Sequence, residues 1–495
     1  MEPSEPEGIG ERGRRIRDVT PKDLVLSVLG GLLVLFVALA SLRVNMFPVI
    51  TNDSVLYLDH SFDIWGGGWV EYGYRQVGYP LFLATARALG DVFGAEPLLT
   101  AAVLQRALLL LAALLAWRFW RWWSLPVIGF MVVGQTLAYT NLLLIEGLAL
   151  PLSLLLVFPT IRLLQLLSRE GSAMQRRRAV GYGVTAVILV LILFSLRFTY
   201  AVFGAVPLVL AVAGWRTGYR RVAISTLGAT VALMGLFVAL MSIENRAEHD
   251  RLSPNVRGEP VKYYYAWQQV FTVHPESRTD PSLQGFYDEG FVHEFVREVD
   301  AMELSPEERK AAFDDEIAEM LEAAGISSGL SMAESSLHAL IGGRLHDTSP
   351  VIRDVVASRD FDTDLVYLNE FAQRRGYEVF VEEYNEGRGA GALLTNSLSV
   401  PLPVPRTKAI VAFLLPLGLI VMVIGLTRGH TRWISVTGLL VVGVFAVGMG
   451  LIRADNLRFL LPTSGFGIAI GTAVLAQLIS ESPYVGSDEG ALDHG

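Results

Sequence analysis

The feature that most constrains this chain is a series of apolar runs, each about 20 residues long. A helix of that length can cross the ~30 Å hydrocarbon core of a bilayer. Hydrophobic residues make up 52% of the 495 positions, in keeping with this pattern. We therefore predict an all-α polytopic membrane protein with about ten transmembrane helices. The predicted spans lie near residues 24–45, 97–118, 125–140, 143–165, 179–196, 198–214, 222–242, 408–427, 432–452 and 458–479.

Arginine-rich segments mark one side of the membrane. "RGRRIR" precedes the first span, and "WRFWRWW", "SREGSAMQRRR", "WRTGYRR" and "TRGHTR" fall in loops on the same side. Basic loops stay in the cytoplasm, so these loops and both termini are predicted to be cytoplasmic. The first apolar run is long enough to span and is expected to be a helix rather than a cleaved signal. We expect a multi-pass protein of a prokaryotic plasma membrane with its active site facing outside.

Two segments are expected to lie outside the membrane on the opposite side. Residues 46–96 mix aromatics, glycines and charges, which is typical of helices in the membrane interface. Residues 244–405 carry about thirty acidic and about fourteen basic side chains and are predicted to form a mostly helical extracytoplasmic insert. The predicted division is a cytoplasmic tail (1–23), a transmembrane module with the interfacial segment (24–243), the acidic insert (244–405), C-terminal transmembrane helices (406–480) and a disordered cytoplasmic tail (481–495).

One helix of the insert can be predicted in detail. In "SPEERKAAFDDEIAEMLEAAG", Ser305 is the expected N-cap, Pro306 takes the first helical position and Glu308 closes a capping box. An apolar stripe follows at helical spacing: Phe313, Ile317, Leu321 and Ala324. The aromatics of "KYYYAWQQVF" (262–271) are expected to pack at the base of the insert rather than to stack on a sugar.

Composition limits the classes of partner. The formal net charge of −9 argues against nucleic acid. The chain has no cysteine, so it has neither disulfides nor a thiolate metal site.

Ionisable residues near the spans gather at one level, opposite the arginine-rich loops. Charged groups at membrane depth are costly and usually functional. These residues are Asp53, Arg106, Glu146, Arg197, Arg453, Asp455 and Arg458. The pattern predicts a cavity at the outer membrane surface for a substrate with an anionic headgroup and a lipid tail. Arginine binds phosphate with a planar, permanently charged fork, and a carboxylate in such a site can act as a general base.

Each of these residues also has a structural interpretation. Asp53 lies in "TNDS", which is good turn or N-cap chemistry. Glu146 fits a helix-start acid favoured by the helix dipole, and Arg197 fits a side chain that extends to the interface. The neighbouring Asp59 and His60 are expected to be solvated helix residues.

Taken in order, several segments resemble the polytopic GT-C glycosyltransferases, which use polyprenyl-phosphate-linked sugars and include protein mannosyltransferases and the aminoarabinose transferase of lipid A. The matching pieces are Asp53 followed by Tyr57 after the first span, "RQVGYPLFLA" opening a juxtamembrane helix, Glu146 opening a later helix, Arg197 between two apolar helices, and "LRFLLP" entering a late span. The resemblance covers the membrane part of the chain. The two-proline form of the juxtamembrane motif is replaced here by Gln76 and Val77.

The resemblance implies a GT-C-like fold and a transferase that moves a hexose or pentose from a lipid phosphate to a glycan, lipid or protein acceptor. Asp53 would take the proton of the acceptor hydroxyl, with Glu146 as a second catalytic group, and the attack would invert the anomeric carbon. The implied lipid-phosphate ligands are Arg75, Arg106, Arg197 and Arg458, and the other implied substrate contacts are Tyr57 and Tyr79. Some relatives bind a divalent cation, so Asp53 and Glu146 are also alternative metal ligands.

Two other functions stay open at this level. A transporter or flippase of a lipid-linked saccharide would have broken helices and polar groups near the midplane, whereas the spans here are apolar at mid-depth. A non-catalytic membrane subunit would use the acidic insert to bind a partner.

Overall fold

The computed structural model describes residues 52–64, 76–132, 143–167, 173–249, 289–341, 407–452 and 457–479, apart from 96, 216 and 303, together with isolated positions within 25–35, 136–140 and 260–267. Every regular element among these residues is a helix. The predicted tails (1–23 and 481–495) and most of the predicted first span (24–45) lie outside the described residues.

Six of the described helical segments are long and apolar enough to cross a membrane. They are Pro97–Met131, Ile145–Leu167, Met174–Leu196, Arg220–Ala247, Arg432–Met449 and Leu460–Ile479. Two shorter apolar stretches are Phe198–Gly214, built from the 3-10 helix η3 (Phe198–Gly204) and α9 (Ala205–Gly214), and Ala409–Gly425. The prediction of an all-α polytopic membrane protein is confirmed, with fewer full-length spans in the described part than the ten or so predicted.

The first long segment contains a sharp break. Helix α4 (Pro97–Trp120) ends where Arg121 takes a φ of 52°, in the left-handed region that an L side chain rarely adopts. The short η2 (Arg121–Ser124) and α5 (Leu125–Met131) follow, and α5 packs back against α4. Helix α4 covers the predicted span 97–118, and α5 covers the first seven residues of the predicted span 125–140, most of whose remainder lies outside the described residues.

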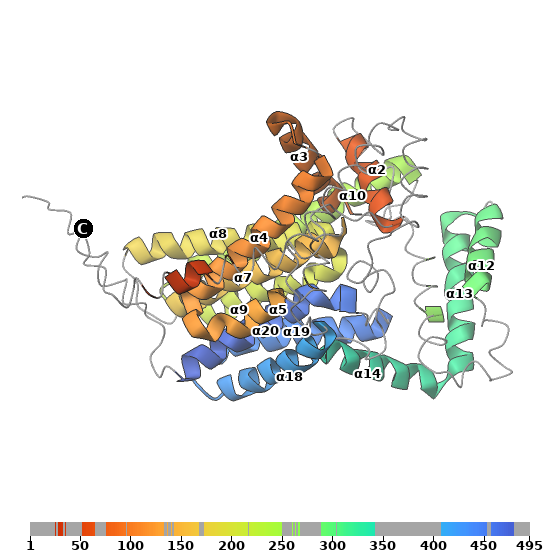
Figure 1. Ribbon diagram of the computed structural model, residues 1–495. Coiled ribbons are helices and arrows are strands. Elements are labelled where there is room, and N and C mark those ends of the chain that lie inside the picture. The colour runs from red at the N-terminus through yellow and green to blue at the C-terminus, as the bar shows by residue number, and fades with distance from the viewer. Residues whose placement is uncertain are drawn as a thin grey trace, which may run out of the picture.

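Helix α7 (Ile145–Leu167) is the centre of the bundle. It packs against α4, α8 (Ala173–Leu196) and α20 (Leu457–Ile479) (Figure 1). Nearly all of its side chains are buried. The Ser153 hydroxyl donates to the Pro462 carbonyl at 2.8 Å, which ties α7 to α20 where water is excluded.

Helices α18 (Thr407–Gly425), α19 (Arg432–Ile452) and α20 form the C-terminal part of the bundle. Gly418 of α18 meets Gly471 of α20 so closely that a Cβ on Gly471 would lie 2.6 Å from the Gly418 Cα. Small residues that let two backbones touch are typical of helix association in lipid.

Two further helices lie at one end of this bundle. Helices α2 (Asn52–Asp63) and α3 (Gly78–Phe93) lie beside the last turns of α10 (Arg220–His249) (Figure 1). Ile64, Val77 and Met241 bury their side chains together there. We call this the Glu146 end, because α7 also starts there. The opposite end, where Arg118, Arg121, Arg220 and Arg428 lie at helix termini and turns, is the arginine-rich end.

The described part of the insert is helical, as predicted. Helices α12 (Glu289–Ala301) and α13 (Pro306–Ala324) lie side by side, and α14 (Ile326–Leu340) returns to pack along α19 (Figure 1). The capping box is confirmed, since the Ser305 hydroxyl accepts from the Glu308 N–H and the Glu308 carboxylate accepts from the Ser305 N–H. Three residues of the predicted apolar stripe, Phe313, Ile317 and Leu321, share one cluster with the aromatics at 263 and 267, so the packing prediction for "KYYYAWQQVF" is confirmed at these two positions. The side chain of Ala324 lies outside the described residues.

Candidate functional site

A buried ion pair joins two of the predicted site residues. Glu146 lies in the first turn of α7 and is fully buried, and Arg197 lies in extended backbone between α8 and η3. Arg197 Nη1 donates to Glu146 Oε1 at 3.1 Å. A carboxylate this buried is costly unless a charge partner compensates it, so each residue holds the other in place. The Arg197 side chain is 19% exposed, and its guanidinium forms an ion pair with Glu146 rather than only extending to water.

Two tyrosines and a glutamine form a second buried polar group. Tyr79, the second residue of α3, is fully buried and its hydroxyl donates to Gln105 Oε1 of α4 at 3.0 Å. The Tyr57 ring of α2 meets the Tyr79 ring edge-on, with centroids 5.2 Å apart. Gln105 Nε2 donates to the Thr140 carbonyl at 3.0 Å, which orients the amide. The hydrogen bonds thus link α3 and α4 to the backbone just before α7.

The two groups are close enough to influence each other electrostatically. Burial, followed by the neighbouring Tyr57 and Glu146, raises the pKa of Tyr79 well above its usual value. The phenol therefore stays protonated and keeps its role as a hydrogen-bond donor. Gly78, next to Tyr79, also packs directly on Ser195, two residues before Arg197. We therefore treat the ion pair and the tyrosines as one polar cluster, which we define as Tyr57, Tyr79, Gln105, Glu146 and Arg197.

A glycine allows this cluster to assemble. A Cβ on Gly78, at the start of α3, would lie 2.4 Å from Ser195 Oγ and 2.5 Å from the Ser195 carbonyl. The first turn of α3 therefore lies directly on the end of α8, two residues before Arg197. The glycine of "RQVGYP" is explained by this close approach, since a larger residue would push Tyr79 away from the ion pair.

The other predicted site residues are placed less completely. Asp53 lies in the first turn of α2, one helical turn before Tyr57, and Arg458 lies in the first turn of α20, but the side chains of both are outside the described residues. Arg106 follows Gln105 in α4 and is 7% exposed. The segments with Arg75, Arg453 and Asp455 also lie outside the described residues.

The sequence interpretation missed two features. Gln105 was not predicted, although a neutral polar residue beside Arg106 in the apolar run "AVLQRALLL" is a signal of its own. The prediction that Asp59 and His60 are solvated is wrong, because the structure buries both at 5% and 0% exposure. Helix α2 packs on α3, and the side of α2 that carries these residues is covered.

The described residues do not form a metal site. No group of three or more His, Cys, Asp or Glu in the described ranges is arranged to hold a metal ion. The Glu146 carboxylate accepts a hydrogen bond from the Arg197 guanidinium, and the side chain of Asp53, the other predicted metal ligand, lies outside the described residues.

Comparison with known proteins gives one weak likeness. No protein-family model matches the chain, and no curated protein matches it in sequence. The crystal structure of ArnT from Cupriavidus metallidurans bound to undecaprenyl phosphate is similar at 14% identity, covering 92% of this chain and 78% of that one, with a TM-score of 0.31. A TM-score this low does not establish a shared fold, so nothing about the activity of this chain follows from it.

Proposed function

We propose that the chain is a membrane glycosyltransferase with a GT-C-like arrangement. It moves a hexose or pentose from a polyprenyl-phosphate donor to a glycan, lipid or protein acceptor outside the cytoplasm. The proposal rests on the resemblance of the motifs in the sequence and on the polar cluster at the Glu146 end.

The observation that carries the proposal is the convergence of that cluster. Its members come from α2, α3, α4, α7 and the turn after α8, yet they lie at one end of an otherwise apolar bundle. A half-buried guanidinium held by a buried carboxylate supports binding of a phosphate at membrane level. Helices α2 and α3, which are not membrane spans, cover the cluster on the side where a lipid headgroup would enter.

The reaction needs one proton transfer and one displacement. Asp53 takes the proton of the acceptor hydroxyl, and the hydroxyl oxygen forms a bond to the anomeric carbon. The bond from that carbon to the phosphate oxygen breaks with inversion, and polyprenyl phosphate leaves as an anion. Arg197, together with Arg75, Arg106 and Arg458, stabilises the leaving phosphate.

The remaining residues of the cluster hold other groups in position. Glu146 holds Arg197 at 3.1 Å, so its proposed catalytic part is to orient the guanidinium toward the phosphate. Tyr79 and Tyr57, which are fully buried and meet edge-on, are proposed to support the donor site from behind.

The decisive experiment uses purified full-length protein in lipid nanodiscs. It measures transfer of radiolabelled sugar from undecaprenyl phosphate to a hydrophobic acceptor for the wild type and for Asp53→Asn and Asp53→Glu. Loss of a base predicts a reduction of roughly 10²–10⁴ for Asp53→Asn with the donor KM preserved, and partial recovery in Asp53→Glu. Full activity of Asp53→Asn would remove the base assignment.

The same preparation separates the transporter alternative. In sealed vesicles, a flippase moves the labelled headgroup across the bilayer without forming a glycosidic bond. Headgroup translocation with no transfer product, for every donor and acceptor tried, would contradict the proposal as a whole.

A further inference from the structure

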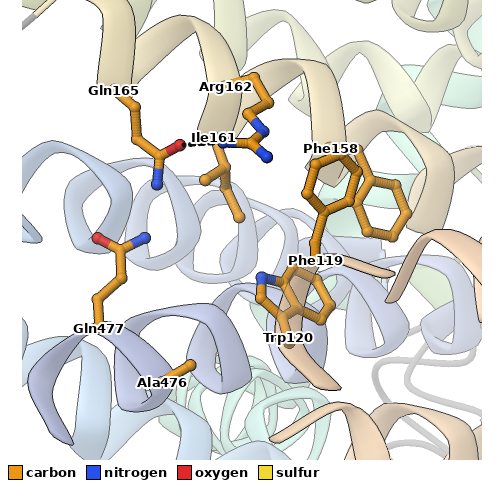
Figure 2. A pocket seen from close by; sticks show the side chains of 8 residues that line it. All are labelled: Phe119, Trp120, Phe158, Ile161, Arg162, Gln165, Ala476 and Gln477. Atoms are coloured by element: carbon orange, nitrogen blue, oxygen red, sulfur yellow. Dashed lines mark hydrogen bonds between the residues drawn. The ribbon is translucent and has the colours of Figure 1, made fainter. Parts of the chain in front are cut away.

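A second site lies at the arginine-rich end of the bundle. A hollow there is lined by the ends of three helices: Phe119 and Trp120 of α4, Phe158, Ile161, Arg162 and Gln165 of α7, and Ala476 and Gln477 of α20 (Figure 2). Arg162 is sixteen residues beyond Glu146 on the same helix, roughly 24 Å along its axis. The hollow is therefore separate from the polar cluster.

Aromatic rings hold the guanidinium of Arg162 in place. The Arg162 guanidinium lies over the Phe119 ring at 4.4 Å from the centroid, and Arg162 Nη1 donates to Gln165 Oε1 at 3.3 Å. Phe158 stacks on both Phe119 and Trp120, with centroids 5.5 and 5.3 Å apart. The guanidinium is thus oriented by the protein before any ligand arrives, which lowers the entropic cost of binding.

The hollow lies at the level of a membrane surface. Arg162 and Gln165 are close to the last turn of α7, and both they and Phe119 keep part of their surface exposed. The nearby Trp122 and Trp123 are exposed, and Arg118 is exposed one residue before Phe119. Tryptophan and arginine at the end of apolar helices are typical of the headgroup region of a bilayer.

We propose that this hollow binds the headgroup of an anionic phospholipid in the leaflet at the arginine-rich end. Arg162 binds the phosphate, and Gln165 and Gln477, which face the hollow from two helices, bind headgroup hydroxyls (Figure 2). The ring of Phe119, which keeps part of its surface exposed, receives the first carbons of the lipid. A choline headgroup is disfavoured, because the aromatic face that would attract its cation is taken by Arg162.

The site joins α4, α7 and α20, so the bound lipid contributes to the contact between the two parts of the bundle. Arg162 is the one charged residue among the described residues that line the hollow. The proposal does not depend on the glycosyltransferase function, because it concerns the other end of the molecule.

The test uses full-length protein in a neutral detergent and native mass spectrometry. Phosphatidylglycerol, phosphatidylcholine and inorganic phosphate are added separately to the wild type and to Arg162→Gln, Arg162→Lys and Arg118→Gln. The last is the matched control, because it removes a charge at the same end outside the hollow. The unfolding temperature of each variant without lipid shows whether it folds, and Gln477→Leu replaces Arg162→Gln if that variant does not.

We expect the wild type to bind phosphatidylglycerol about tenfold more tightly than phosphatidylcholine. Arg162→Gln should remove this preference, Arg162→Lys should retain part of it, and Arg118→Gln should leave it unchanged. Equal affinity for the two lipids in the wild type, or equal losses in Arg162→Gln and Arg118→Gln, would overturn the proposal. Competition by millimolar inorganic phosphate would also overturn it, because the ligand would then be a free anion.

Discussion

At the scale of single residues, the Glu146 end shows how a carboxylate can be held inside an apolar bundle. Glu146 is fully buried and is bonded to a guanidinium that keeps 19% of its surface exposed. Removing one partner from such a pair leaves the other charge in a poorly solvating environment. The pair therefore couples the stability of the bundle to the geometry of the proposed phosphate site.

Substitutions at this pair should separate the two roles. We expect Glu146→Gln to lower the free energy of unfolding by about 3 kcal/mol, because Arg197 loses its compensating charge. Arg197→Lys keeps the charge but loses the fork, so it should mainly raise the donor KM. Denaturant unfolding and transfer kinetics measure these effects.

The matched control is the exposed Lys310–Asp314 pair of α13. Lys310→Met should change stability by less than about 0.5 kcal/mol, because both partners are solvated. Equal changes in the free energy of unfolding for Glu146→Gln and Lys310→Met would show that burial does not increase the contribution of the Glu146 pair to stability.

A second residue-scale prediction concerns Gly78. Gly78→Ala places a methyl group 2.5 Å from the Ser195 backbone, so α3 must shift and Tyr79 must move from Gln105. We expect a loss of about 1–3 kcal/mol in stability and a loss of transfer activity. Gly181→Ala in α8 is the control, since its methyl group meets open space. A shift in unfolding temperature no larger than that of the control would contradict the close packing.

At the scale of elements, α13 shows that local sequence signals can be sufficient. Its capping box was predicted from spacing and is present, as is the apolar stripe at Phe313, Ile317 and Leu321. These signals act within one or two turns, so they do not depend on the rest of the fold. The pKa of Glu316 in α13, in contrast, depends on burial and on a neighbouring charge.

Glu316 should make the stability of α13 depend on pH. Burial, followed by repulsion from Glu319, raises the pKa of Glu316 above its usual value. Because the folded-state pKa is raised, the contribution is complete at pH below the usual carboxyl value and is lost as pH rises through the folded-state pKa. We expect Glu316→Gln to increase amide protection in α13 at pH 7 and to flatten its pH dependence, measured by hydrogen exchange of the full protein. Asp315→Asn, at an exposed position, should leave the profile unchanged, and an unaltered profile in Glu316→Gln would contradict the assignment.

At the scale of the whole molecule, the bundle has two chemically different ends. The Glu146 end carries the polar cluster together with α2 and α3, and the arginine-rich end carries the hollow around Arg162. Helix α14 also packs against α19, and its C-terminal residues Ala339 and Leu340 join the core of the bundle. The insert and the bundle are therefore expected to act as one body.

The orientation of the two ends can be tested directly, because the chain has no cysteine. Asp315→Cys in α13 and Gly429→Cys in the turn between α18 and α19 each add one exposed thiol. In intact cells, an impermeant maleimide should label Asp315→Cys, while Gly429→Cys should react only after permeabilisation. The reverse pattern would show that the arginine-rich end faces outside and would remove the proposed site from the outer surface.

Much of the architecture could be predicted because it depends on periodicity and segment length. The apolar runs, the arginine asymmetry, the capping box and the division between the spans 97–118 and 125–140 are all local or compositional signals. The site was predicted only in part. Glu146 and Arg197 were both predicted to lie at one outer cavity, but no pattern indicated that they would pair with each other, or that Gln105 would hold Tyr79.

The sequence by itself determined that this chain forms membrane-crossing helices and which of its charges lie near their ends, because hydrophobic length and charge asymmetry act on each segment separately. The tertiary structure alone decided which of those charges pair, that Asp59 and His60 are buried, and that Arg162 lies over an aromatic ring in a hollow between three helices. The physical reason is that these contacts join residues far apart along the chain, such as the 51 positions between Glu146 and Arg197. Their formation depends on how backbones approach, as at Gly78 and Ser195, and not on any property of the separate segments.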